Sequence, residues 1–212
     1  MTKNEDPTRE RILLSALAVF SERGLAKTSL NEVAYRAGVT RVTVYRHFAE
    51  KKELVRAAFL RVEQVFEKAL ADLERNPHAD RDKILDQIGE GLSALPRSDA
   101  IARMDELKRL YPDVYRAIQE VRVATLKSLF EHLFGAIKRQ GRLRSGLNRS
   151  LVQAVFWELT INLYDNPRLK TFGLSDAELY RAMKDIFLYG ILGSRRSRAS
   201  GAGHSTIKTE PR

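Results

Sequence analysis

The chain of 212 residues contains no cysteine. This absence excludes a disulfide framework, a thiol nucleophile and any metal site built on cysteine, and it is compatible with a reducing compartment. No run of about 18 apolar residues occurs, so we expect no transmembrane helix. The first ten residues, MTKNEDPTRE, are polar and acid-bearing, unlike a signal peptide. We therefore expect a cytoplasmic protein that has no membrane partner.

Histidine is also scarce, with four in the chain. None of them stands in a pattern that suggests a nucleophile and its base, and His132 has no second histidine at metal-ligand spacing. A glycine-rich phosphate loop is absent as well. We expect no enzyme, no cofactor and no metal site, and these absences disfavour the alternative of an all-helical enzyme.

Positive charge is in excess, and it is concentrated at the two ends of the sequence. The formal net charge is +10. Residues 1–60 carry 11 Lys or Arg against 7 Asp or Glu, residues 61–193 carry 21 against 19, and residues 194–212 carry 5 against 1. A basic N-terminal segment on a nearly neutral body indicates a face that binds a polyanion, although solubility alone is the simpler explanation.

Helical patterns dominate the rest of the sequence. Apolar residues recur at i, i+3, i+4 and i+7 in about nine segments, and no internal repeat of solenoid period is visible. Asp6 and Pro7 are a helix start, while Ser29 and Glu32 have the spacing of a capping box. The tail at 194–212 has too few apolar residues to form a core, so we expect disorder there. The predicted fold class is all-α.

One stretch, VTRVTVY at residues 39–45, has the composition of a β-strand. A strand requires a partner, and the chain offers none. A helix that begins after Thr40 as N-cap would place Val44 and Phe48 on one face, three or four residues after a helix that ends at Gly38. Two helices with this short connection form a helix-turn-helix, whose second helix enters the major groove of DNA.

The side chains of this unit suit DNA. Arg41 can bind guanine O6 and N7 with two hydrogen bonds, and Thr40 and Thr43 can contact thymine methyls or phosphates. The N-terminus of the preceding helix, at Ser29 and Asn31, favours a phosphate. The remaining donors for phosphate oxygens are Tyr45, His47 and Lys51. A short helical hairpin with a solvated polar face is the structural alternative.

At this point the residues resemble a known family. TSLNEVAYRAGVTRVTVYRHFAEKKEL, preceded by ILLSALAVFSERG, is similar to the N-terminal domain of TetR-family transcriptional regulators. The matching motifs are F-x-x-x-G, T-S-L-x-x-V-A, A-G-V-T and V-Y-x-H-F, which together cover about residues 8–60. The resemblance implies that Arg41 and Tyr45 lie near base edges and that Thr43, His47 and Lys51 hold the DNA backbone.

Three positions depart from the usual family pattern. Val42 stands where a small residue or proline is frequent, and it either touches a thymine methyl or fills space. Glu50 replaces the usual cap of the fourth helix. Arg46 adds a cation to the recognition helix.

The resemblance further implies a DNA-binding domain at residues 6–55, an effector-binding and dimerisation domain at 56–193, and the basic tail at 194–212. The implied partners are a palindromic DNA operator, a second copy of the chain, and a small hydrophobic or amphipathic ligand that releases the repressor. The ligand candidates are Phe66, Met104, Leu107, Tyr111, Phe130, Phe134, Phe156, Trp157 and Tyr164. The dimer candidates are Phe187, Tyr189, Gly190, Leu192 and Gly193. A DNA-binding regulator without a small-molecule effector remains the alternative.

Overall fold

The computed structural model describes residues 6–76, 81–96, 100–139, 144–160 and 172–191. Over these ranges the chain forms nine α-helices and no strand, as the sequence predicts. They are α1 (Pro7–Arg23), α2 (Leu30–Arg36), α3 (Arg41–His47), α4 (Lys51–Arg75), α5 (Arg81–Ala94), α6 (Ala100–Leu110), α7 (Pro112–Arg139), α8 (Arg149–Thr160) and α10 (Asp176–Ile191). Among these helices, none combines the length and apolarity that a bilayer crossing requires.

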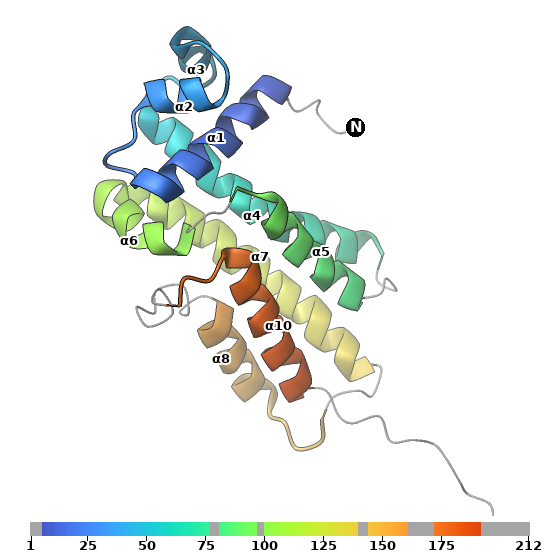
Figure 1. The fold of residues 1–212 in the computed structure, drawn as a ribbon. Helices are drawn as coiled ribbons and strands as arrows, with labels where there is room; N and C mark the ends of the chain where they lie inside the picture. The colour runs from blue at the N-terminus through green and yellow to red at the C-terminus, as the bar shows by residue number, and fades with distance from the viewer. Residues whose placement is uncertain (1–5, 77–80, 97–99, 140–143, 161–171, 192–212) are drawn as a thin grey trace, which may run out of the picture.

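Helices α1 to α3 form a small unit at one end of the molecule (Figure 1). The side chain of Asp6 accepts a hydrogen bond from the amide of Thr8 at 2.9 Å, and Pro7 occupies the first turn, so α1 begins as predicted. The helix ends at Gly24, whose φ of 85° is strained for any residue with a Cβ. The buried face of α1 then packs on α2 and α4.

Helix α3 begins where the capping residues predict, despite its β-branched composition. The Oγ1 of Thr40 accepts a hydrogen bond from the amide of Thr43 at 3.1 Å. Val44 and Phe48 are almost fully buried, at 0% and 1% exposure, so tertiary packing outweighs the strand propensity of this segment. Gly38, with φ of 62°, supplies the turn between α2 and α3.

The long helix α4 connects this unit to the rest of the molecule (Figure 1). Its N-cap Glu50 makes no capping hydrogen bond; Glu53 instead accepts one from the amide of Ala49 at 2.7 Å. The predicted domain boundary at 55/56 falls inside α4, and a single hydrophobic core continues through it. The unit of α1 to α3 and the body formed by α5 to α10 therefore share one continuous helix.

Helices α5 and α7 pack against α4, α10 packs against α5, and α8 and α10 lie side by side at the other end of the molecule (Figure 1). Gly91 of α5 allows a close approach to α4, because a Cβ there would lie 2.8 Å from Cγ1 of Val65. The hydroxyl of Tyr180 on α10 donates to the carbonyl of Leu85 on α5 at 2.8 Å. These contacts position α5 against α4 and α10, three of the helices that surround the cavity described below.

Candidate functional site

The outward face of α3 carries a cation, an aliphatic side chain and an aromatic ring. Arg41, Val42 and Tyr45 are all exposed, Val42 at 78%. The guanidinium of Arg41 donates to the hydroxyl of Tyr45 at 3.1 Å and lies 5.2 Å from the centre of its ring. Val42 therefore does not fill space in the core. The face combines the forked donor and the apolar contacts that base edges in a major groove accept.

Thr40 and Thr43 occupy the start of α3. Their hydroxyls lie 2.9 Å apart, so one donates to the other while Thr40 caps the helix. Both residues retain exposed surface. The pair is held in place by the cap, which orients it at the end of the helix where a phosphate would also meet the amide groups.

His47 differs from the expectation that it contacts phosphate. Its side chain is only 13% exposed, and its Nδ1 lies 3.6 Å from a carboxylate oxygen of Asp6. Within the described chain, its Nε2 is buried and has no hydrogen-bond partner. This position fastens the end of α3 to the start of α1, whereas Arg46 beside it is exposed.

The start of α2 is organised by its own capping box. Ser29 and Glu32 exchange hydrogen bonds, with the Ser29 amide donating to Glu32 at 2.8 Å. Asn31 is exposed beside them.

The ammonium of Lys51, at the start of α4, lies 3.4 Å from the carbonyl oxygen of Ala26. Burial lowers the pKa of the Lys51 ammonium, opposed by the nearby Glu106 and Glu32, and a phosphate at this place would stabilise the charged form.

One exposed aromatic side chain was not among the DNA-binding residues predicted from the sequence. Tyr35 of α2 is 90% exposed, the largest value among the exposed hydrophobic side chains of the described residues. An exposed tyrosine hydroxyl on α2 can donate a hydrogen bond to a phosphate oxygen. Tyr35 does not belong to the apolar stripe of Leu30, Val33 and Ala34, so the spacing of the sequence alone indicates that it is exposed.

Two residues of α6 hold the turn that joins α1 to α2. The carboxylate of Glu106 accepts hydrogen bonds from the amides of Leu25 and Ala26, both at 2.8 Å. Arg103 donates to the carbonyl of Ser21 at 2.6 Å. Burial disfavours the Glu106 carboxylate, but the two amide hydrogen bonds outweigh burial and hold its pKa below the usual value. Helix α6 is thus bound directly to the DNA-binding unit.

A second contact fastens the start of α4 to the start of α7. The ammonium of Lys52 lies 2.7 Å from a carboxylate oxygen of Asp113, and this hydrogen bond raises the pKa of Lys52 and lowers that of Asp113. Tyr111, a predicted ligand residue, lies half-buried between α6 and α7 at this corner. It belongs to the junction between the two halves of the molecule.

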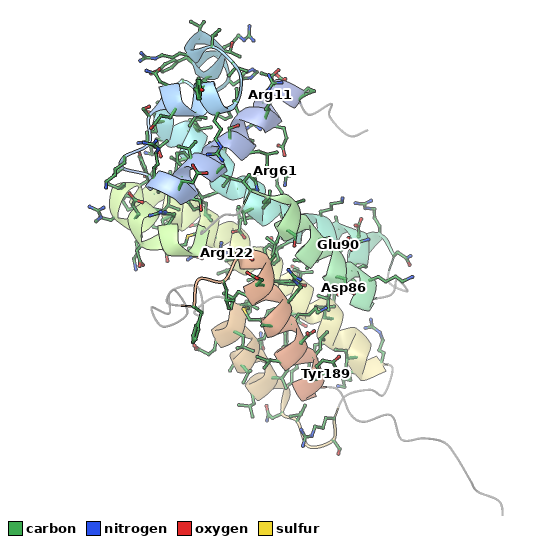
Figure 2. The ribbon with its side chains drawn as sticks, in the orientation of Figure 1. Arg11, Arg61, Asp86, Glu90, Arg122 and Tyr189 are labelled. Carbon is green, nitrogen blue, oxygen red and sulfur yellow. The ribbon has the colours of Figure 1, made fainter. Side chains whose placement is uncertain are left out.

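The body contains a cavity lined by α4, α5, α7, α8 and α10. The cavity volume is about 70 Å³, and the cavity has an open mouth to solvent. Most of the wall is apolar, but Glu63 and Arg122 form an ion pair in it, at 2% and 5% side-chain exposure. Arg122 lies where α7 passes the start of α10 (Figure 2). An enclosed apolar space with a few polar groups is the usual form of a small-molecule site.

The structure brings two of the nine predicted ligand residues to this cavity, Phe66 and Phe156. Trp157 packs against Phe156, with ring centres 5.5 Å apart. Met104, Leu107, Phe130 and Phe134 are buried in the core and are not among the lining residues. Tyr164 lies outside the described residues. The sequence did not single out the polar lining residues, Glu63, Arg122, Thr125 and Lys184.

Apolar surface is exposed on α8 and α10. Ile186 and Tyr189 of α10 are 65% and 78% exposed, and Leu151 and Val155 of α8 are 61% and 44% exposed. Tyr189 lies near the end of α10 (Figure 2). Of the predicted dimer residues, Gly190 is exposed, Phe187 instead contributes to the cavity wall, and Leu192 and Gly193 lie outside the described residues.

Residues 12–58 match the family model described as "Bacterial regulatory proteins, tetR family". This segment, which includes α2 and α3, therefore resembles the DNA-binding domain of that family. The chain is 27% identical over 161 residues to the "Probable acrEF/envCD operon repressor" of Escherichia coli K12, and 70% of each chain is covered. It is 39% identical over 80 residues to the transcriptional repressor BepR of Brucella suis, with 38% of each chain covered.

The fold is shared with solved structures of transcriptional regulators. SmeT, the repressor of the Stenotrophomonas maltophilia efflux pump SmeDEF, superposes with a TM-score of 0.51 at 23% identity, covering 91% of this chain and 94% of SmeT. The relatives named here are regulators of transcription rather than enzymes. The chain is accordingly a DNA-binding transcriptional regulator, with α2 and α3 as its helix-turn-helix.

Proposed function

We propose that this chain is a homodimeric repressor of the TetR family that binds a palindromic DNA operator and is released by a small amphipathic molecule. The observation that carries the proposal is the exposed face of α3, with Arg41, Val42 and Tyr45 turned outward on a helix capped at Thr40. The efflux-operon repressors to which the chain is similar support the assignment as a repressor.

The exposed apolar side chains of α8 and α10 support the proposal of a dimer. Four large apolar residues on two neighbouring helices exceed the isolated exposure that a monomer usually shows. Pairing of α8 and α10 with their copies would bury this surface and hold two α3 helices at a fixed separation. Half-sites about 34–36 Å apart, one turn of DNA, are the geometry that such a dimer reads.

Release by a ligand needs a connection between the cavity and α3, and three contacts supply one. Helix α4 lines the cavity through Glu63 and Phe66 and begins beside α3. Glu106 of α6 binds the turn between α1 and α2, and Asp113 of α7 binds the start of α4. A ligand that favours one arrangement of α4 and α6 over another would shift the population of DNA-competent dimers.

Sedimentation of the protein with a labelled duplex tests this proposal. We expect a dimer alone and two chains on each specific duplex, with binding that depends on sequence. A monomer that binds unrelated duplexes with equal affinity would contradict it. A dimer that binds its operator, but that no amphipathic compound displaces, would leave the regulator without a small-molecule effector.

A further inference from the structure

The cavity wall combines a few polar side chains with a mainly apolar lining. Glu63, Arg122 and Thr125 come from α4 and α7, and Lys184 comes from α10. The remaining wall is formed mainly by aliphatic and aromatic side chains, among them Leu129, Leu133, Phe156 and Phe187. A molecule that fills this space needs a polar group at one place and an apolar body elsewhere.

The charged side chains that line the cavity carry a net positive charge. Arg122 donates from both Nε and Nη2 to one oxygen of Glu63, the first at 3.1 Å, so these two groups neutralise each other. Lys184 is a second cation in the same wall, with 18% side-chain exposure. The three charged residues of the lining therefore leave one net positive charge in a largely apolar space.

The partners of Lys184 lie outside the cavity. Its ammonium is 2.5 Å from Asp86 of α5 and 3.7 Å from Asp185, whose side chains are 56% and 57% exposed. Figure 2 shows Asp86 on α5 beside α10. The hydrogen bond to Asp86 raises the pKa of Lys184, which keeps the ammonium charged. Because exposed carboxylates are well solvated, turning Lys184 from them toward a ligand costs little free energy.

We propose that the cavity binds an amphipathic molecule with a carboxylate headgroup, received by Lys184 and Arg122, and an aliphatic body along Leu129, Leu133, Phe156 and Phe187. A guanidinium has five N–H groups and can serve two carboxylates at once, so an anion joins the pair without breaking it. This inference names the ligand class of the proposed function and rests on it.

A cationic ligand fits the same charges poorly. To reach Glu63 it would compete with Arg122, and it would leave that guanidinium buried beside two other cations. Breaking a buried ion pair by removing one partner is strongly unfavourable. A neutral ligand would gain from the apolar wall alone and would leave Lys184 paired with Asp86 and Asp185.

The chain contains a tryptophan whose fluorescence can report ligand binding to the cavity. Trp157 is the one tryptophan of the sequence, and its ring packs edge-on against Phe156, a lining residue. Its fluorescence is titrated at pH 7, in the absence of DNA, with three molecules of equal chain length: decanoate, decylamine and decanol. We expect decanoate to bind about tenfold more tightly than either of the others, because a hydrogen bond to a charged group contributes more than a neutral one.

Lys184 is the residue to change, since a substitution of Arg122 alone would strand a buried Glu63. Lys184→Gln should weaken decanoate about tenfold and leave decanol within about twofold, and Lys184→Arg should restore decanoate. Lys127→Gln, an exposed lysine of α7 outside the cavity, is the matched control and should change neither. Retained decanol binding shows that each variant is folded.

Equal binding of the three molecules, tighter binding of decylamine, no binding at all, or an unchanged decanoate affinity in Lys184→Gln would overturn the carboxylate assignment. A separate assay asks whether decanoate displaces the protein from DNA. Binding with the expected preference but without displacement supports the assignment and contradicts the proposed release mechanism, so the two failures are distinguishable.

Discussion

Arg41 projects from the first turn of α3 and is the side chain expected to read a base. Arg41→Ala should cost roughly 1–3 kcal/mol of discrimination at one position in each half-site, because a bidentate contact to guanine is lost. Lys51→Ala is the comparison, and it should weaken all duplexes alike. Anisotropy titrations on operators with single-base changes measure both. If the two variants lost affinity in the same way across these operators, the assignment of base reading to Arg41 and of phosphate binding to Lys51 would be wrong.

Substitution of Glu106 tests the contact between α6 and the turn that joins α1 to α2. Glu106→Ala removes two charge-assisted hydrogen bonds and should lower the free energy of unfolding by roughly 1–3 kcal/mol, whereas Glu120→Ala on the exposed side of α7 should not. The pKa of Glu106 is lowered in the folded chain. Its stabilisation is therefore present above the ordinary glutamate pKa and is lost as pH falls through the folded value.

Denaturant titrations at neutral and acid pH check this dependence. The difference in unfolding free energy between wild type and Glu106→Ala should shrink as the pH falls below the ordinary pKa of a glutamate. A difference that stays constant down to that range would show that the two amide hydrogen bonds do not depend on the charge of the carboxylate.

Single residues also show where sequence reasoning stops. Asp6, Ser29 and Thr40 act on amides two or three positions away, so their capping roles were readable from spacing and are observed. The burial of His47 depends on Asp6, which is 41 positions earlier. No local pattern distinguishes a histidine that faces phosphate from one that faces a neighbouring helix.

At the scale of elements, α8 and α10 carry the prediction of a dimer. Ile186→Glu combined with Tyr189→Glu places two charges in the apolar surface and should convert the dimer to a monomer at micromolar concentration. Gln64→Glu, an exposed position on α4, is the control. Sedimentation velocity distinguishes the two outcomes, and a dimer that survives the double substitution would place the interface elsewhere.

The predicted helix starts at Asp6, Ser29 and Thr40 agree with the structure, but the predicted cavity wall was largely different. Periodicity identifies the apolar faces of α7, yet it does not say which face meets a cavity and which meets another helix. Phe130 and Phe134 stack at 5.4 Å and Phe130 packs against Phe156, while Leu129 and Leu133 line the cavity. That choice depends on where α8 and α10 pack, which is tertiary information.

For the whole molecule, the basic excess should appear as a steep salt dependence of DNA binding. The logarithm of the association constant falls with the logarithm of salt concentration, by about 0.9 for each phosphate neutralised. Lys51→Ala should flatten this slope by about 0.9 per half-site if its ammonium binds a phosphate. An unchanged slope would mean that Lys51 serves only the turn at Ala26.

Selection of bound duplexes from a random pool tests the central claim most directly, which is that α3 reads a DNA sequence as part of a symmetric dimer. The wild-type protein should recover an inverted repeat with half-sites about one helical turn apart, roughly 10 base pairs. Arg41→Ala, selected in parallel, should recover the same repeat with one position per half-site relaxed. Recovery of unrelated sequences of uniform affinity by the wild-type protein would contradict the claim.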